Sequence, residues 1–184
     1  MRHPALLDRP QTALLVIDIQ ARVHAAMCFG QQVEQNAVKL LRGFQVLRVP
    51  IYVTEQYPQG LGHTIPAVAE ALAGAQPLQK MSFSCCGSEA LMAGLKERGI
   101  QQLLLCGIET HVCVSQTAHD LLAHGFQVHV ARDAVSSRRE GDHTNALERM
   151  RAAGAVITTT EAALFELMVR ADIAEFKAIS ALVK

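Results

Sequence analysis

The sequence predicts a three-layer α/β/α protein, in which a mostly parallel sheet lies between two layers of helices. Short β-branched or leucine-rich runs alternate along the chain with stretches whose apolar residues recur at helical spacing. Strands that are separated by helices cannot pair as hairpins, so we expect a parallel sheet with right-handed crossovers and helices on both faces. The chain has 184 residues, half of them hydrophobic, which fits one domain over residues 1–184.

Apolar runs predict the strands. The clearest are Leu14-Leu-Val-Ile17 and Leu103-Leu-Leu-Cys106, and both are far shorter than the ~20 residues of a membrane-spanning helix. No membrane partner is therefore expected. In chain order, the strands are expected at residues 12–19, 50–54, 77–80, 101–107, 127–131 and 155–159.

The stretches between these runs predict the helices. In the first stretch, one apolar face recurs at the spacing i, i+4, i+7, i+8 and i+11 and consists of Val33, Ala37, Leu40, Leu41 and Phe44. Ser88 and Thr160 are expected to cap two later helices at their N-termini. The helices are expected at residues 31–47, 65–73, 88–98, 111–123, 140–152 and 161–169.

Composition and charge limit the possible partners. The 17 basic side chains balance the 17 acidic ones, and only 4% of the residues are aromatic, so neither phosphate attraction nor base stacking is favoured and no nucleic-acid partner is expected. A neutral chain suits small uncharged or weakly charged substrates. The high apolar content with few aromatics also predicts that sister subunits cover some apolar surface, as in a homo-oligomer.

The five cysteines are an odd number, so at least one thiol is free. Asp8 precedes any apolar run of signal-peptide length. Both observations favour a cytoplasmic protein with reduced thiols.

Three polar residues stand where predicted strands end. Asp18 follows the apolar run Leu14-Leu-Val-Ile17 of the first strand, Lys80 ends the third, and Cys113 lies where the fourth strand leads into a helix. Taken singly, they fit a loop acceptor, a solvated charge and a small buried hydrophobe. Ligands of open α/β sheets bind beyond the carboxyl ends of the strands, however, so the three side chains are expected to converge on one pocket.

Such a trio suits acyl transfer. The pKa of a thiol falls beside a cation and at the positive end of a helix, so Lys80 would stabilise the Cys113 thiolate. Asp18 would take the thiol proton, pass it to a leaving amine and later activate water. Backbone N–H groups before the helix would form an oxyanion hole.

The same segments resemble a known family. Leu14-Leu-Val-Ile-Asp18-Ile-Gln20, Lys80-Met-Ser-Phe-Ser84 and Gly107-Ile-Glu-Thr-His-Val-Cys113-Val114 are similar to the three signature segments of the isochorismatase-like cysteine hydrolase superfamily. Thr54-Glu-Gln-Tyr-Pro58 is similar to its branch of isochorismatase domain-containing hydrolases. The resemblance implies a Rossmann-like six-stranded sheet of order 3-2-1-4-5-6, homo-oligomers, and a catalytic triad of Asp18, Lys80 and Cys113.

The resemblance also implies details of the pocket. A cis peptide is expected between Ile108 and Glu109, and it would direct the N–H of Glu109, together with that of Cys113, at the oxyanion. The candidates for lining the substrate pocket are Gln20, Gln56, Tyr57, Phe83 and Thr110.

No metal or other cofactor is expected. Nicotinamidases of the superfamily bind a metal through an Asp-x-His pair and a further His after the second strand, whereas residues 55–63 of this chain contain one His and no Asp. True isochorismatases do not need a cysteine at the nucleophile position, so Cys113 favours amide chemistry. The leading hypothesis is a metal-independent cysteine hydrolase that cleaves a small amide or related C–N bond.

Several alternatives stay open. The chain could be a non-catalytic scaffold or binding member of the family, or an isochorismatase-type vinyl-ether hydrolase. Cys85 and Cys86 could be a redox pair or two free thiols beside the site. Arg138 and Arg139 could be a solvated charge pair of a loop, or could bind an anion or form part of an interface. His111 and His119 are interpreted as hydrogen-bonding or interface residues.

Overall fold

A parallel six-stranded sheet forms the centre of the molecule. The computed structural model describes residues 2–3 and 5–184. All strand pairs are parallel and the strand order is β3-β2-β1-β4-β5-β6, which confirms the predicted class and the order that the resemblance implied. The strands are β1 (Thr12–Ile17), β2 (Ile51–Gln56), β3 (Leu78–Lys80), β4 (Gln102–Ile108), β5 (Gln127–Ser136) and β6 (Val156–Thr158).

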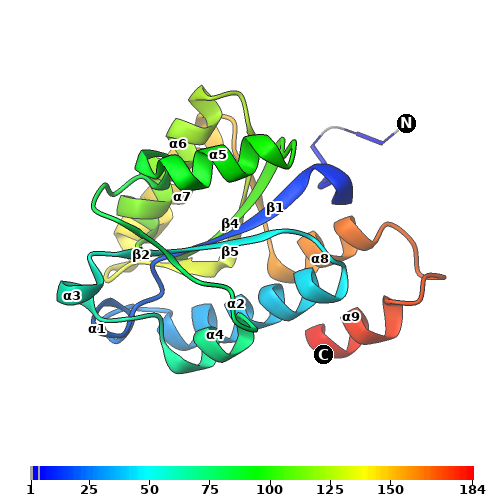
Figure 1. Ribbon diagram of the computed structural model, residues 1–184, viewed down its shortest axis with the longest axis horizontal. Coiled ribbons are helices and arrows are strands. Elements are labelled where there is room, and N and C mark those ends of the chain that lie inside the picture. The colour runs from blue at the N-terminus through cyan, green and yellow to red at the C-terminus, as the bar shows by residue number, and fades with distance from the viewer. Residues whose placement is uncertain (1, 4) are drawn as a thin grey trace.

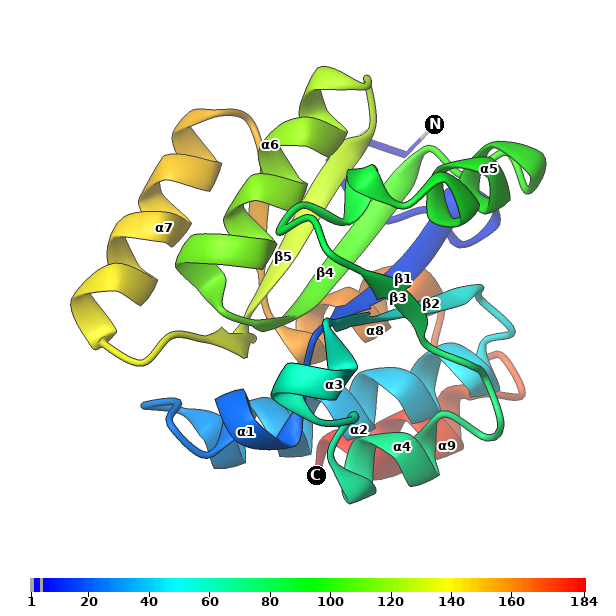
Figure 2. The ribbon, with the colours of Figure 1, turned by 60° about the vertical axis from the view of Figure 1, so that its left-hand side comes forward.

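Helices cover both faces of the sheet, as Figures 1 and 2 show. One layer consists of α5 (Glu89–Glu97), α6 (Ser115–Ala123) and α7 (Glu140–Ala152). The other consists of α2 (Gly30–Val46), α4 (Pro66–Ala71), α8 (Thr160–Met168) and α9 (Phe176–Val183). Within the described ranges, no helix has both the length and the apolar character to span a bilayer.

The sheet divides the apolar core into two parts. All six residues of β1 are buried, because β1 lies between β2 and β4 and is covered by a helical layer on each face. Successive side chains of a strand point to opposite faces. Accordingly, Leu14 and Val16 pack with the α2 layer, whereas Leu15 and Ile17 pack with the α5 layer.

Three of the helices are not predicted by the sequence patterns. Helices α1 (Ala21–His24) and α3 (Pro58–Leu61) are single turns, too short to show a helical period. Both follow the carboxyl ends of strands, α1 after β1 and α3 after β2, so they stand beside the expected site (Figure 1). The third is α9, which packs on α2 and α8.

Most predicted boundaries lie within two residues of the observed ones, but two elements differ more. β5 continues to Ser136, beyond the predicted end at residue 131. The charged Arg132 and Asp133 end its apolar run where the register with β4 shifts, and pairing with β4 resumes at Val135. The helix predicted from residue 111 consists of a π-helical segment, Thr110–Val114, followed by α6 from Ser115.

Of the two predicted helix caps, one is confirmed and the other is wrong. Ser88 caps α5, since its hydroxyl accepts a hydrogen bond from the backbone of Leu91. Helix α8 is capped by Thr159 and not by Thr160. The backbone N–H and hydroxyl of Thr160 instead donate to the Asp133 carboxylate, so this residue ties the start of α8 to β5.

Candidate active site

A buried ion pair joins the ends of two strands. Asp18 follows β1 with a left-handed backbone (φ 51°), and Lys80 is the last residue of β3. Lys80 Nζ donates to Asp18 Oδ2 at 2.6 Å, with side-chain exposures of 1% and 5%. Thr54, at the same level of the intervening strand β2, donates to the other carboxylate oxygen at 2.8 Å. Both oxygens of Asp18 are therefore held.

Lys80 makes further hydrogen bonds with its ammonium group. Nζ donates to the side-chain oxygen of Gln56 at 2.9 Å and lies 3.1 Å from the carbonyl oxygens of Ser82 and Phe83. A buried ammonium is tolerated only when opposite charge and oxygen acceptors replace its water. Lys80 thereby connects Asp18, the end of β2 and the loop after β3.

Cys113 lies in the π-helical segment, buried against the same carboxylate. Burial of the thiol and then the negative charge of Asp18 raise the pKa of Cys113 far above its ordinary value, and the charge of Lys80 opposes them. Lys80 thus acts in the predicted direction, but the predicted net lowering of the pKa is wrong. The reason is that the loss of water and the carboxylate beside the thiol together outweigh the charge of Lys80.

Cys85 is a second thiol behind the site. It is fully buried, its sulfur lies 3.6 Å from the Thr54 hydroxyl, and burial followed by the charge of Asp18 raises its pKa to about 11. Cys86 is also a free thiol, so the structure agrees with two separate thiols and not with a bonded redox pair.

The peptide between Ile108 and Glu109 is cis, as the resemblance implied. The carboxylate of Glu109 accepts hydrogen bonds from Arg138, at 3.1 Å from the backbone N–H and 3.0 Å from Nε. This pair connects the turn after β4 with the chain that leaves β5.

A cavity of about 400 Å³ brings most of the predicted residues together. Of these residues, its wall includes Asp18, Gln20, Gln56, Phe83, Glu109 and Cys113. Gln20 serves mainly the backbone: its amide donates to the carbonyls of Gln56 and Gly62 and accepts from the N–H of Gln56. Lys80 stands behind Asp18 and outside the wall.

Two predicted pocket residues do not reach this cavity. Tyr57 is 47% exposed and has a left-handed backbone (φ 38°), and it lies outside the lining of the cavity. Thr110 is fully buried, and its hydroxyl lies 3.0 Å from Nδ1 of His143 in α7. Both errors arise because closeness in sequence does not fix the direction of a side chain.

The wall also contains residues that the motifs do not indicate. Arg22 and Val23 come from the single-turn helix α1, Leu61 from α3 and Val112 from the π-helical segment. Arg138 lines the cavity too. The sequence indicates a place for it at the site only through the alternative that it binds an anion. His111 and His119 form hydrogen bonds, with the Ser137 hydroxyl and the Ser115 carbonyl.

Glu55, near the end of β2, forms hydrogen bonds within the protein. Burial alone would raise the pKa of Glu55, but hydrogen bonds from Thr64 and His63 outweigh it and lower the pKa. Thr64 donates twice, at 2.7 and 2.8 Å, and His63 lies 3.1 Å away. In the part of the chain that the structure describes, no three His, Cys, Asp or Glu side chains are grouped to hold a metal ion.

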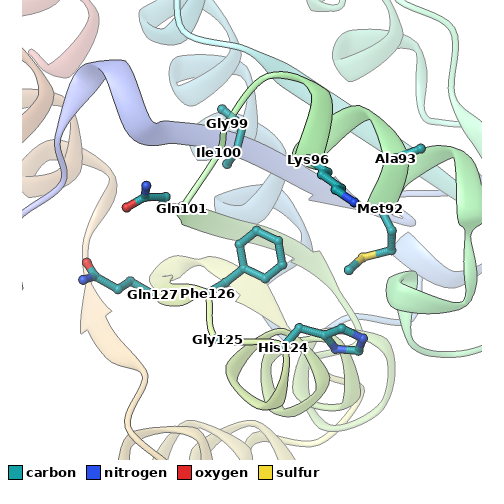
Figure 3. Close-up of a pocket in the computed structure, with 10 residues that line it drawn as sticks. All are labelled: Met92, Ala93, Lys96, Gly99, Ile100, Gln101, His124, Gly125, Phe126 and Gln127. Carbon is teal, nitrogen blue, oxygen red and sulfur yellow. The ribbon is translucent and has the colours of Figure 1, made fainter.

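A larger, shallower hollow of about 630 Å³ lies at the amino ends of the strands, where β4 and β5 begin (Figure 3). Met92, Lys96 and Phe126 contribute to its wall, which has neither a carboxylate nor a thiol among its ten described residues. The chemistry is therefore expected at the smaller cavity.

Comparison with known proteins identifies relatives over nearly the whole chain. The family profile described as "Isochorismatase domain" matches residues 12–162. Isochorismatase domain-containing protein 2 of Danio rerio is 40% identical over 177 residues, which cover 96% of this chain and 88% of the relative.

Solved structures also match nearly the whole chain. A structure described as the MAR1 ribonuclease from Caenorhabditis elegans has a TM-score of 0.92 and 38% identity, and covers 97% of this chain and 92% of its own. YcaC from Pseudomonas aeruginosa, described with hexane-2,5-diol and covalent acrylamide, has a TM-score of 0.90 and 25% identity, covering 99% and 93%. Since the profile and the relatives each span most of the sequence and share its sheet, the chain belongs to the isochorismatase family.

Proposed function

We propose that this hydrolase-family protein cleaves a small amide or related C–N bond through an acyl-enzyme on Cys113. The observation that carries the proposal is the placement of Cys113 and Asp18 on the wall of one cavity, with Lys80 bonded to Asp18 from behind. A nucleophile beside a base that a third group orients is the arrangement that covalent catalysis requires.

The raised pKa of Cys113 sets the order of proton transfers. The thiol is neutral before substrate binds, so Asp18 takes its proton as the sulfur attacks the carbonyl carbon and an S–C bond forms. The tetrahedral intermediate collapses, the C–N bond breaks, and Asp18 returns the proton to the leaving nitrogen. Asp18 then takes a proton from water, whose oxygen attacks the acyl carbon. The C–S bond breaks, and the thiolate regains its proton.

Lys80 acts as a positioning residue in this scheme. Its ammonium group holds Oδ2 of Asp18 while Thr54 holds Oδ1, which leaves the carboxylate little freedom to rotate. The backbone N–H groups of Glu109 and Cys113 are the proposed oxyanion donors. Loss of one such donor typically costs about 3 kcal/mol of transition-state stabilisation.

The relative with covalent acrylamide supports a reactive nucleophile in this fold. Acrylamide is an electrophile that forms stable adducts with thiolates, and it also carries an amide group. Its bound state in that protein fits a site that accepts small amides and contains a nucleophilic atom.

Ammonia release from a panel of small amides tests the proposal. Cys113→Ala is expected to lower kcat/KM at least a thousandfold, and Asp18→Asn at least a hundredfold. Asparagine tolerates the left-handed backbone at position 18, so this variant should fold. Cys86→Ala is the matched control, since this thiol lies outside the cavity lining and its loss should leave the rate unchanged.

Other results of these assays would favour one of the alternative functions. Amide hydrolysis that survives Cys113→Ala would contradict the acyl-enzyme, and vinyl-ether cleavage that survives it would favour an isochorismatase. An RNA oligonucleotide belongs in the panel because one relative is described as a ribonuclease. If no substrate turns over and iodoacetamide labels Cys113 no faster than the fully buried Cys106, the chain is a non-catalytic scaffold.

We also propose that the chain forms a homo-oligomer and works in the cytoplasm. Large apolar side chains are exposed, including Met81 at 71%, Phe83 at 54% and Val169 at 58%, and all five thiols are free. Sedimentation velocity at micromolar concentration is expected to show a species larger than the 20.0 kDa chain. A single 20.0 kDa species would contradict the assembly.

A further inference from the structure

The charges around the active-site cavity do not balance. Four charged side chains line it: Asp18, Glu109, Arg22 and Arg138. Each carboxylate already has a cationic partner, since Asp18 pairs with Lys80 at 2.6 Å and Glu109 pairs with Arg138 at 3.0 Å. Both negative charges of the wall are therefore neutralised within the protein.

Arg22 is the cation left over. It lies in α1, and its Nη1 donates to the backbone carbonyl of Gly60 at 2.6 Å, a neutral acceptor. Across residues 2–3 and 5–184, no carboxylate lies within ion-pair distance of its guanidinium group. Counting Lys80 and Arg138 against the two carboxylates, the cavity and its supporting groups carry one uncompensated positive charge.

We propose that Arg22 binds the carboxylate of an anionic substrate. The contact with Gly60 anchors the guanidinium and uses one of its five N–H donors, which leaves others free for a planar, two-pronged hydrogen bond to a carboxylate. This inference rests on the proposed amide hydrolysis and narrows the substrate to a small amide with a carboxylate at its far end.

The rest of the wall suits such a molecule. Val23, Leu61 and Val112 supply apolar surface for a short hydrocarbon segment between the two polar ends. The volume of about 400 Å³ is near the lower limit of ligand pockets, which span about 300 to 1,000 Å³. The chain as a whole has no net charge, so the positive charge is a local property of this cavity.

Alkylation with paired reagents tests the charge preference without turnover. Iodoacetate and iodoacetamide transfer the same carbon to a thiolate with loss of iodide, but only iodoacetate is an anion. We expect the ratio of the iodoacetate rate to the iodoacetamide rate, measured by peptide mass spectrometry at low salt, to be higher at Cys113 than at the exposed Cys28 of the same molecule.

Variants assign this preference to one residue. Arg22→Gln should lower the ratio at Cys113 at least threefold and leave the ratio at Cys28 unchanged. Arg149→Gln, a matched change on the exposed face of α7, should leave both unchanged. An equal ratio at the two thiols, or a ratio at Cys113 that survives Arg22→Gln, would overturn the proposal.

A substrate pair separates this inference from the proposed function. Succinamate and butyramide have the same chain length and the same amide, and only succinamate carries a carboxylate. We expect a higher kcat/KM for succinamate, and Arg22→Gln should bring the ratio of the two towards one. Equal hydrolysis of both amides would overturn the role of Arg22 while the hydrolase stands. No amide hydrolysis with an intact iodoacetate preference would overturn the amidase while the anion site stands.

Discussion

At the scale of single residues, the site depends on a charge that does not line the cavity. The side chain of Lys80 is 1% exposed and is held by Asp18, by the side-chain oxygen of Gln56 and by carbonyl oxygens of the loop after β3. A buried ion pair adds little net stability, but removal of one partner leaves the other charge buried without compensation. Stability and the position of the Asp18 carboxylate are therefore coupled at Lys80.

Lys80→Met is expected to lower the free energy of unfolding by about 3–5 kcal/mol at pH 7, because Asp18 would keep a buried charge without its partner. Urea denaturation measures the change. The double variant Lys80→Met/Asp18→Asn should recover much of the loss, since a neutral amide replaces the carboxylate and can keep the hydrogen bond from Thr54. A loss below about 1 kcal/mol in the single variant would show that water solvates Asp18.

At the scale of elements, β1 and β4 approach each other closely where β4 leads towards Cys113. Gly107 has φ +126°, and a Cβ atom there would lie 2.0 Å from the carbonyl oxygen of Ile17 and 2.7 Å from its backbone nitrogen. The contact is with backbone in the middle of a sheet, which cannot move aside. The register between β4 and β5 also shifts between Leu105 and Gly107.

Gly107→Ala is therefore expected to abolish folding or to cost more than about 4 kcal/mol. Gly99→Ala is the matched control, because Gly99 also has a positive φ, +63°, but a Cβ atom there meets nothing within 4 Å. The control should cost about 1 kcal/mol. Soluble yield and thermal melts compare the two, and equal losses would show that backbone conformation and not the close approach decides the requirement for glycine.

At the scale of the whole molecule, one buried histidine is expected to make stability depend on pH. His129 in β5 is fully buried, and within the described ranges neither ring nitrogen has a hydrogen-bond partner. Burial lowers the pKa of His129 to about 4. The unfolded chain, with a histidine pKa of about 6.5, binds the proton more readily, so stability is lost as the pH falls from about 6.5 to 4.

Between pH 7 and pH 5 this linkage amounts to about 2 kcal/mol. Urea denaturation at the two pH values should show the loss in the natural protein and a smaller one in His129→Leu, whose side chain does not titrate. The leucine variant is also expected to be more stable at pH 7, because it removes an unsatisfied buried donor. An equal pH dependence in both proteins would assign the acid sensitivity to other groups.

Most of the fold could be predicted because it depends on apolar periodicity. The six strands and the longer helices α2, α5, α7 and α8 follow such patterns, whereas the one-turn helices α1 and α3 have too few residues to show any. The extension of β5 was missed because Arg132 and Asp133 end its apolar run, and the sequence does not show that pairing with β4 resumes at Val135. Thr160 was taken as a cap because sequence cannot show that Asp133 would bind it.

The candidate site, like the fold, could be predicted only in part. Asp18, Lys80 and Cys113 could be located because strand ends of a parallel sheet meet at one edge. The net charge of the cavity could not be predicted. Arg22 reaches the cavity from helix α1, which the sequence patterns do not indicate, and Glu109 pairs with Arg138 in the chain after β5. The pKa of Cys113 was misjudged for a related reason: motif spacing carries no information on solvent access.

The C-terminal helix α9 lies beyond residues 12–162, the segment shared with the family profile, yet its Ile179 is fully buried in the core on the α2 face. Leu7 enters the same core from the other end of the chain, and an ion pair between Arg9 and Glu175 at 3.2 Å joins the two flanks. The segment that matches the family profile is thus shorter than the segment that contributes to this core. Boundaries for expression, fusion or domain exchange should follow the buried flanks, because a protein trimmed to residues 12–162 would lose Leu7 and Ile179 from its interior.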